Sequence, residues 1–314
     1  GSHGYNDFWI LKIDENGSKI WDKRYGGGAE DKCLYALELE NGDFALSGYS
    51  RSGISGDKTH GSMGHTDSWL IRVDENGTKI WDHTYGGDFF DFAIKVEVAS
   101  DGNWLVFGHS SSNPGSSKTA SAKGGDDYWA IKVNVENGSM IWDKSYGGES
   151  YDYFDDALVQ EDGSFIMVGL SYAASANTGD RQSIAKGESS DLWVVKADAN
   201  GSNLWERSYG GEKGVGWNSR ILSFDTGEFL ISSAAKGIAT GDISGGQRNT
   251  GDSDSDYWLI KIDQDGNKIW DRRYGGGGYE DSKSIIPTND GGFLLGGWSY
   301  SMAGFDKTHA RYSL

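Results

Sequence analysis

One segment of sequence occurs five times in this chain of 314 residues, and this repetition restricts the possible folds more than any other feature. The copies include "NDFWILKIDENGSKIWDKRYGGG" at 6–28 and "DYWLIKIDQDGNKIWDRRYGGG" at 256–277. The first tryptophan of the segment falls at Trp9, Trp69, Trp129, Trp193 and Trp258. Subtracting neighbouring positions gives steps of 60, 60, 64 and 65 residues. A period of this length indicates an array of similar structural units.

Each repeat contains four short apolar stretches with the alternation that is typical of β-strands. In the first complete repeat, the expected strands cover residues 33–39, 44–50, 68–74 and 79–85. Asx-Gly turns join the first strand to the second and the third to the fourth. Such pairs favour tight hairpins, in which we expect both turn residues to adopt positive φ. No stretch shows a convincing helical apolar period, so the sequence predicts an all-β protein.

Four antiparallel strands in each of five repeats predict a five-bladed β-propeller of four-stranded antiparallel blades. The chain starts with the third and fourth strands of a unit, 7–25, and ends with the first and second strands, 282–300. We expect these halves to pair into one blade, which would leave no open sheet edge. Residues 1–3 are interpreted as a tag remnant, and 4–314 as a single five-bladed propeller domain.

Composition restricts the partners. The formal net charge is −18, with 47 acidic and 29 basic residues, which argues against nucleic acid or an anionic membrane as a partner. No apolar stretch is long enough to suggest membrane insertion. The only cysteine, Cys33, lies in an apolar strand, so there is no disulfide framework.

The string "DYWLIKIDQDGNKIWDRRYGGGGYEDSKSIIPTNDGGFLLGGWSYS" resembles repeats in secreted and surface proteins of Bacteroidetes, which often precede a type IX secretion sorting domain. The resemblance covers nearly the whole chain. It implies an extracellular β-propeller, secreted or on the cell surface, without implying one activity, because a fold can host many functions. The fourth repeat departs from the pattern, since its "YGGEKGVGWNSR" lacks the acidic residue found in the others.

Two sets of loops are expected on one face of the sheets. The glycine loops run from each Tyr-Gly-Gly to the next strand, and the long loops join the second and third strands of each repeat. Function concentrates in long irregular loops, so this face is the expected site. An incomplete ring of carboxylates follows six residues after the tyrosines, at Asp31, Asp91, Asp152 and Glu280. The fourth repeat has Val215 there.

Aromatic side chains accompany these carboxylates in the glycine loops. They are Phe89, Phe90, Tyr151, Tyr153, Trp217 and Tyr279. Aromatic rings stack on the apolar faces of sugars, and carboxylates accept hydrogen bonds from sugar hydroxyls, so the ten residues together form a candidate carbohydrate site. The alternative is that the carboxylates cap the loops by accepting backbone N–H bonds.

Other acidic residues are interpreted as structural. Asp57, Asp180, Asp242 and Asp306 recur in the long loops, with Ser117 in the remaining copy, and favour Asx-turns. The "GDSDSD" stretch places Asp252, Asp254 and Asp256 at alternate positions, as a calcium loop begins, but it lacks the glycine and the distal glutamate of such a loop. No His/Cys spacing fits zinc. We therefore expect no cofactor, with calcium as an alternative.

The sequence favours a non-catalytic extracellular recognition module that binds a polysaccharide or glycoprotein through the loop face. One alternative is a structural or protein-binding module of a surface adhesin. A second is a glycoside hydrolase that would draw two carboxylates from Asp31, Asp91, Asp152 and Glu280. The hydrolase needs an acid and a base in different environments, whereas repeat-equivalent residues start in similar ones.

Overall fold

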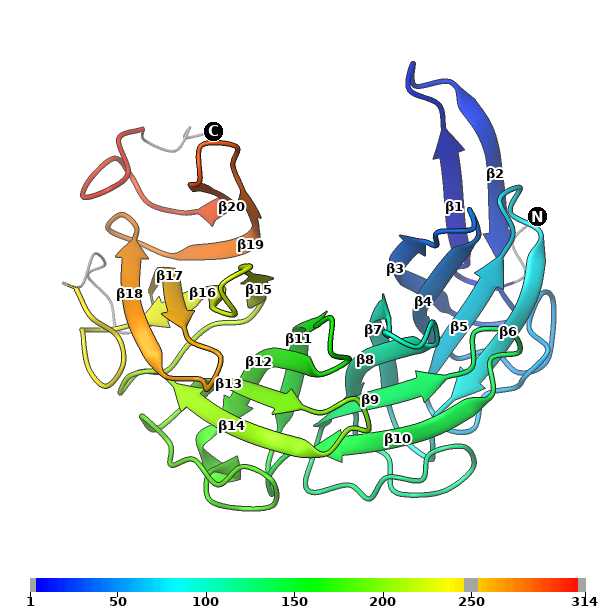
Figure 1. The fold of residues 1–314 in the computed structure, drawn as a ribbon, viewed down its shortest axis with the longest axis horizontal. Helices are drawn as coiled ribbons and strands as arrows, with labels where there is room; N and C mark the ends of the chain where they lie inside the picture. Colours follow the sequence, from blue (N-terminus) through cyan, green and yellow to red (C-terminus); the bar gives the residue numbers. More distant parts are fainter. Residues whose placement is uncertain (1–3, 246–253, 310–314) are drawn as a thin grey trace. The chain divides into compact units, whose positions relative to one another are not determined.

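The computed structural model describes residues 4–245 and 254–309, whose regular structure is almost entirely β-strand (Figure 1). The chain divides into two compact units. Unit 1 comprises Gly1–Ala122 and Asp126–Ser145, and unit 2 comprises Lys123–Gly125 and Tyr146–Leu314. Each unit is described by itself below.

The first ten strands in chain order are β1 Phe8–Ile13, β2 Lys19–Tyr25, β3 Asp31–Glu38, β4 Phe44–Ser50, β5 Asp67–Val73, β6 Lys79–Tyr85, β7 Asp91–Val98, β8 Trp104–Ser110, β9 Asp127–Val133 and β10 Met140–Tyr146. The later elements are β11 Asp152–Val159, β12 Phe165–Tyr172, the short 3-10 helix η1 Ala173–Ser175, β13 Ser190–Ala197, β14 Asn203–Tyr209, β15 Arg220–Ser223, β16 Phe229–Lys236, β17 Ser255–Ile262, β18 Lys268–Tyr274, β19 Glu280–Pro287 and β20 Phe293–Ser299. The strands expected in the first complete repeat agree with β3 to β6 within two residues.

The strands form antiparallel sheets in which chain neighbours are also sheet neighbours. Four sheets have four strands, β3–β6, β7–β10, β11–β14 and β15–β18. This arrangement confirms the all-β class and fits a propeller. The strands β1–β2 and β19–β20 each form a two-stranded sheet, the first in unit 1 and the second in unit 2. The pairing of these two sheets into a fifth blade, and the single domain that it implies, stay predictions.

The turns between third and fourth strands show how the sequence sets the hairpins. At the β5–β6 turn, Gly77 N donates to Asp74 O at 2.9 Å, and Asp74 Oδ1 accepts from the backbone of Thr78 at 2.7 Å. Gly77 has φ of +73°, whereas Asn76 is absent from the non-glycine residues with positive φ. The expectation of two positive-φ residues per turn was therefore wrong. A register shift between Arg72 and Val73 supplies a bulge instead, so one glycine is enough.

The recurring tryptophan is buried in each complete sheet. Trp69, Trp129, Trp193 and Trp258 are at most 1% exposed. Each indole N–H donates to an acidic side chain of the fourth strand; in the first complete repeat Trp69 donates to Asp82 Oδ2 at 3.1 Å. Asp82 also accepts from the backbone and hydroxyl of Thr59 in the long loop, at 3.0 and 2.8 Å. One carboxylate thus satisfies a buried donor and fixes the loop above it.

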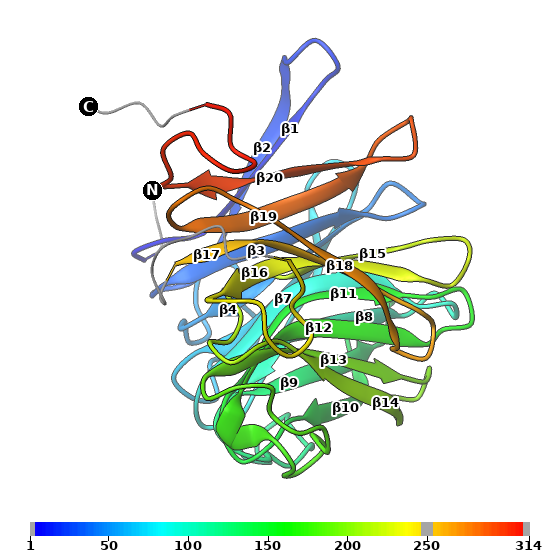
Figure 2. The same ribbon diagram turned by 90° about the vertical axis from the view of Figure 1, so that its left-hand side faces the viewer.

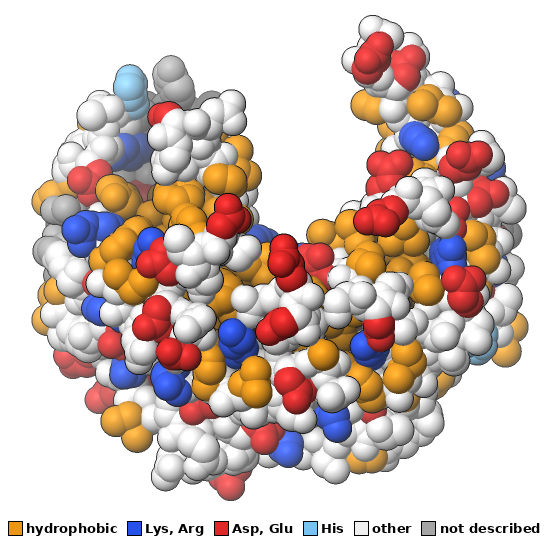
Figure 3. Space-filling model, in the orientation of Figure 1, with side chains coloured by type: hydrophobic (Ala, Val, Ile, Leu, Met, Phe, Trp, Pro, Cys, Tyr) orange, Lys and Arg blue, Asp and Glu red, His pale blue; other side chains and the backbone are white. Residues whose placement is uncertain are grey.

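The two loop sets lie at the same end of the sheets, as the sequence predicts. Within unit 2, Figure 2 shows the short β15–β16 and β19–β20 turns on one side and the longer loops on the other. Hydrogen bonds join a glycine loop to a long loop in every complete repeat; Asp57 N, for example, donates to Gly26 O at 2.8 Å. Figure 3 shows the short-turn side of unit 2, where acidic and basic side chains are interspersed.

Candidate functional site

The four carboxylates of the expected ring accept hydrogen bonds from the glycine loops. Asp31, Asp91, Asp152 and Glu280 are at most 3% exposed. Asp91 Oδ2 accepts from Gly87 N at 2.9 Å and from Ser112 Oγ at 2.8 Å, and its second oxygen accepts from the Ser110 hydroxyl.

The same contacts recur in the other repeats. The second glycine of each Tyr-Gly-Gly donates to Asp31 at 2.7 Å, to Asp152 at 2.8 Å and to Glu280 at 2.9 Å. Burial raises the pKa of Asp91 and Asp152, although the serine and glycine hydrogen bonds oppose the shift. This geometry is the loop capping that the sequence left open. It points these oxygens at the protein's own loops, so direct ligand contact by the four carboxylates has no support from their placement.

A substitution can separate capping from ligand contact. We expect Asp91→Ala to lower the free energy of unfolding by about 1–3 kcal/mol, because the Gly87 N–H and two buried serine hydroxyls lose their acceptor. Urea unfolding followed by tryptophan fluorescence measures this change. A folded Asp91→Ala protein of unchanged stability that has lost ligand binding would contradict the capping role.

The recurring polar residues of the long loops also accept hydrogen bonds from backbone N–H groups. Gly26 N donates to Asp57 Oδ2 at 3.2 Å, and Gly86 N donates to Ser117 Oγ at 2.9 Å. Of the possible calcium residues, Asp252 lies outside the described residues, and Asp256 forms a buried ion pair with Arg273 at 2.5 Å. Within residues 4–245 and 254–309, no group of three or more His, Cys, Asp or Glu could hold a metal ion.

Unit 2 brings together three of the predicted aromatic residues. Tyr153 of β11 packs against Trp217 with ring centroids 4.8 Å apart, and Tyr151 stacks on Tyr153 at 5.9 Å with an interplanar angle of 5°. Tyr172, at the end of β12, meets both tyrosines edge-on at 6.3 Å. We call these four residues the aromatic platform. Tyr151 remains 49% exposed and Trp217 41% exposed, so each leaves ring surface open to solvent.

The two residues that follow Trp217 form hydrogen bonds to two neighbouring strands. Asn218 has φ of +70°, and its amide donates to Asp281 Oδ2 at 3.1 Å. Ser219 N donates to Asp155 Oδ2 at 2.9 Å, and loss of water raises the pKa of Asp155 to about 6. These bonds to β11 and β19 fix the backbone next to Trp217. The platform therefore has little freedom to lose when a ligand binds.

The other predicted aromatic residues form separate groups. In unit 1, Phe89 and Phe90 face His65, with ring centroids 6.4 and 5.5 Å away. In unit 2, Tyr279 meets Tyr300 at 6.4 Å. Sequence reasoning missed Tyr172, Tyr300 and His65 because they lie in strand ends or long loops, and only contacts between loops reveal them.

Comparisons with known proteins give no family for this chain. No known family profile matches it. A curated relative, the regulatory protein FlaEY of Caulobacter vibrioides, is 27% identical over 174 residues, which is 53% of this chain and 18% of that protein. The chain thus spans less than a fifth of the length of this relative.

Solved structures with similar folds share very little sequence with this chain. Hydrazine synthase of Kuenenia stuttgartiensis has a TM-score of 0.46 at 9% identity, covering 89% of this chain and 64% of that one. A GH43 β-1,3-galactosidase has a TM-score of 0.35 at 12% identity, covering 89% and 53%. A DUF4221 protein of Bacteroides vulgatus has a TM-score of 0.39 at 10% identity, covering 92% and 80%. Scores this low carry no argument about function.

Across the described residues, no helix combines the length and the apolar character that a membrane crossing requires.

Proposed function

We propose that this protein is a non-catalytic extracellular recognition module that binds a polysaccharide or glycoprotein glycan through the aromatic platform of unit 2. The observation that carries the proposal is the tilted pair of Tyr153 and Trp217, extended by Tyr151, with half-exposed rings on a segment bonded to two strands. A position outside the cell follows from the sequence resemblance and is part of the same proposal.

The chemistry of the platform suits sugars. The apolar C–H faces of a pyranose ring stack on indole and phenol rings, and the polar edge of the sugar needs hydrogen-bonding groups nearby. Tyr151 and Tyr172 supply hydroxyl groups, and the Asn218 amide adjoins Trp217. A strongly acidic protein repels anionic ligands, so we expect neutral glycans to bind better than sulfated or carboxylated ones.

A glycan array with purified wild type and Trp217→Ala tests the proposal. We expect wild type to bind at least one class of neutral glycan. The variant should lose about tenfold to a hundredfold in affinity, because one stacking contact contributes roughly 1–3 kcal/mol, as aromatic stacking does on bases. Titration calorimetry with the best array ligand measures the loss.

Two variants serve as controls. Trp217→Phe keeps an aromatic face and should retain part of the affinity. Ile184→Ala removes a side chain that is 71% exposed in a long loop of the same unit and should bind as wild type does. Absence of any glycan binding, or equal binding by Trp217→Ala, rules out the platform as the site. In the first case a protein-binding module of a surface adhesin becomes the better explanation.

The glycoside hydrolase hypothesis gains no support from the carboxylates on which it relied. Asp31, Asp91, Asp152 and Glu280 accept hydrogen bonds from glycine N–H groups and serine hydroxyls, and they lie beneath the loop surface. An assay for the release of reducing sugar from the array ligands tests this hypothesis, and measurable release would support it. We also propose that the five repeats close into a five-bladed propeller, which would bring the loops of all repeats to one face.

A further inference from the structure

The loop that follows β20 exposes three large apolar side chains on unit 2. Tyr300, Met302 and Phe305 are 65%, 59% and 63% exposed, and they line a groove of about 270 Å³. The remaining lining residues are glycine, alanine and serine, so none of the described residues that line the groove is charged. Figure 2 shows this loop on the side of the longer loops of unit 2. An apolar groove without charge, in a chain of formal net charge −18, indicates a surface that binds a neutral partner.

Phe305 has a backbone conformation that favours glycine. It lies in a tight turn in which Gly304 N donates to Lys307 O at 2.7 Å and Lys307 N donates to Gly304 O at 3.0 Å. Its φ is +53°, in the left-handed region that bulky side chains rarely adopt. The other long loops have φ between +53° and +60° at the same position, which is occupied by Gly56, Ser116, Gly179 and Gly241. Backbone strain of this kind concentrates at ligand sites, so the phenylalanine indicates a function rather than a folding role.

The same loop positions are also exposed in the first complete repeat, in unit 1. Counting from the recurring aspartate of the long loops, Met302 corresponds to Gly53, which is exposed. Phe305 corresponds to Gly56, which is exposed as well. Ile54, in the same loop, is 74% exposed. The apolar side chains of the last repeat are therefore additions to an outer loop surface and not members of a core.

The groove adjoins a tyrosine pair that repeats part of the aromatic platform. Tyr279 and Tyr300 occupy the positions of Tyr151 and Tyr172 in their repeat. The rings lie 6.4 Å apart at 66° in the first pair and 6.3 Å apart at 72° in the second. In each pair the later tyrosine donates its backbone N–H to the carbonyl of the earlier one, at 2.8 and 3.0 Å. Two repeats of unit 2 thus present the same edge-to-face pair on their loops.

Hydrogen bonds within unit 2 connect the platform to this second aromatic group. Asn218, next to Trp217, donates to Asp281 Oδ2 at 3.1 Å in strand β19, which begins directly after Tyr279. The groove itself is held from below by Ser301, which is buried. Its hydroxyl accepts from Gly278 N at 2.8 Å and donates to the Glu280 carboxylate. The groove is therefore largely formed before any ligand binds.

We propose that Tyr300, Met302 and Phe305, together with Tyr279, form a second glycan subsite, which binds another segment of the same neutral polysaccharide as the platform. This inference rests on the proposed function of the platform and extends it to long chains. The C–H faces of a sugar stack on tyrosine and phenylalanine rings, and a methionine supplies an adaptable apolar contact. Two subsites on one protein raise the affinity for a polymer without any new contact at either subsite.

Titration calorimetry with trisaccharides counts the subsites. The probes are mannotriose, laminaritriose and maltotriose, with galactomannan, laminarin and amylopectin as the matching polymers. Wild type should bind about two trisaccharides per chain, and Phe305→Gly and Trp217→Ala about one each. The affinity for the polymer should fall at least about tenfold in each variant, because the two subsites no longer act together. Ile54→Ala, at an exposed residue of the equivalent loop in unit 1, should bind as wild type does.

Thermal unfolding of Phe305→Gly separates binding from folding. Glycine adopts the φ of this position without strain, so we expect the variant to unfold at the same temperature as wild type or at a higher one. A lower unfolding temperature would assign Phe305 to the fold and overturn the proposal.

The binding results distinguish the second subsite from the platform. One trisaccharide per wild-type chain, lost in Trp217→Ala and kept in Phe305→Gly, overturns the second subsite and leaves the proposed function of the platform intact. One trisaccharide per chain, lost in Phe305→Gly and kept in Trp217→Ala, supports the second subsite and rules out the platform. Absence of binding by every probe overturns both proposals.

Discussion

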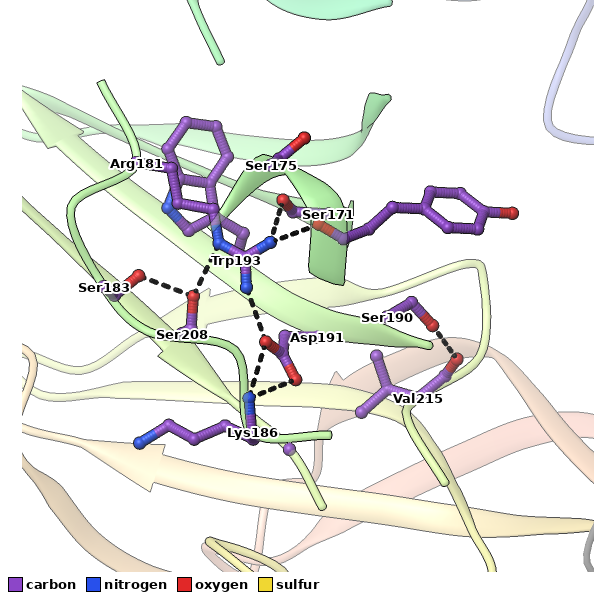
Figure 4. Close-up of polar contacts among 12 residues, drawn as sticks. Ser171, Ser175, Arg181, Ser183, Lys186, Ser190, Asp191, Trp193, Ser208 and Val215 are labelled. Atoms are coloured by element: carbon purple, nitrogen blue, oxygen red, sulfur yellow. Dashed lines mark hydrogen bonds and ion pairs between the residues drawn. The ribbon is translucent and has the colours of Figure 1, made fainter. Parts of the chain in front are cut away.

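Replacing Arg181 with isoleucine is expected to lower the free energy of unfolding by about 3–5 kcal/mol, because it leaves the Asp191 carboxylate buried without its cation. Arg181 is 0% exposed, and its Nη2 lies 2.5 Å from Asp191 Oδ2. Nε donates to Ser208 Oγ at 3.1 Å, and Nη1 donates to the Tyr172 carbonyl at 2.7 Å. Figure 4 shows Ser208 and Asp191, from strands β14 and β13, bonded to the guanidinium group that the long loop supplies.

The chain itself suggests the compensating change. In the next repeat Ile243 stands at the position of Arg181, and Arg273 stands at the position of Ser208. Arg273 reaches the equivalent aspartate, Asp256, at 2.5 Å. We therefore expect Arg181→Ile with Ser208→Arg to recover part of the lost stability in urea unfolding. The surface variant Lys19→Ala, which removes an exposed pair with Asp22, should cost at most about 1 kcal/mol. A single Arg181→Ile variant as stable as wild type would show that the buried pair contributes nothing.

Replacing Trp258 with alanine is expected to cost about 3–5 kcal/mol, through lost burial and the cavity left behind. The side chain is 0% exposed in a cluster with Ile231, Ile260 and Ile262. Its indole N–H also donates a hydrogen bond to Asp271 Oδ2 at 3.0 Å. Urea unfolding followed by circular dichroism measures the change without depending on the removed fluorophore.

Trp217→Ala is the matched control, because it deletes the same side chain from a half-exposed position. We expect its stability to change by less than about 1 kcal/mol, since surface substitutions away from the core have small effects. The pair of variants therefore separates a tryptophan that holds the fold from one that is free to bind a ligand. Equal destabilisation by both variants would contradict this division.

The strands and the core were predictable because they depend on local pattern. Alternating apolar residues and Asx-Gly turns placed β3 to β6 within two residues of their positions, and the repeat identified the buried tryptophans. The sequence also identified Tyr151, Tyr153 and Trp217 as candidate ligand-binding residues. It could not show that Tyr153 and Trp217 touch, because that contact depends on how strand β11 and the glycine loop before β15 meet.

The sequence by itself determined the five repeats and the all-β class, since periodicity is a property of neighbours along the chain. The tertiary structure decided the roles of the polar residues. Asp91 could have faced a ligand or its own loop, and only the placement of Ser110 at the end of β8 and of Ser112 in the loop after it turned it inward. Likewise, the sequence alone did not show that the buried aspartate of one repeat pairs with Arg181 of the long loop, whereas that of the next repeat pairs with Arg273 of the fourth strand. Long-range contacts set the environment of a charged group, and that environment decides whether the group holds the fold or is available to a partner.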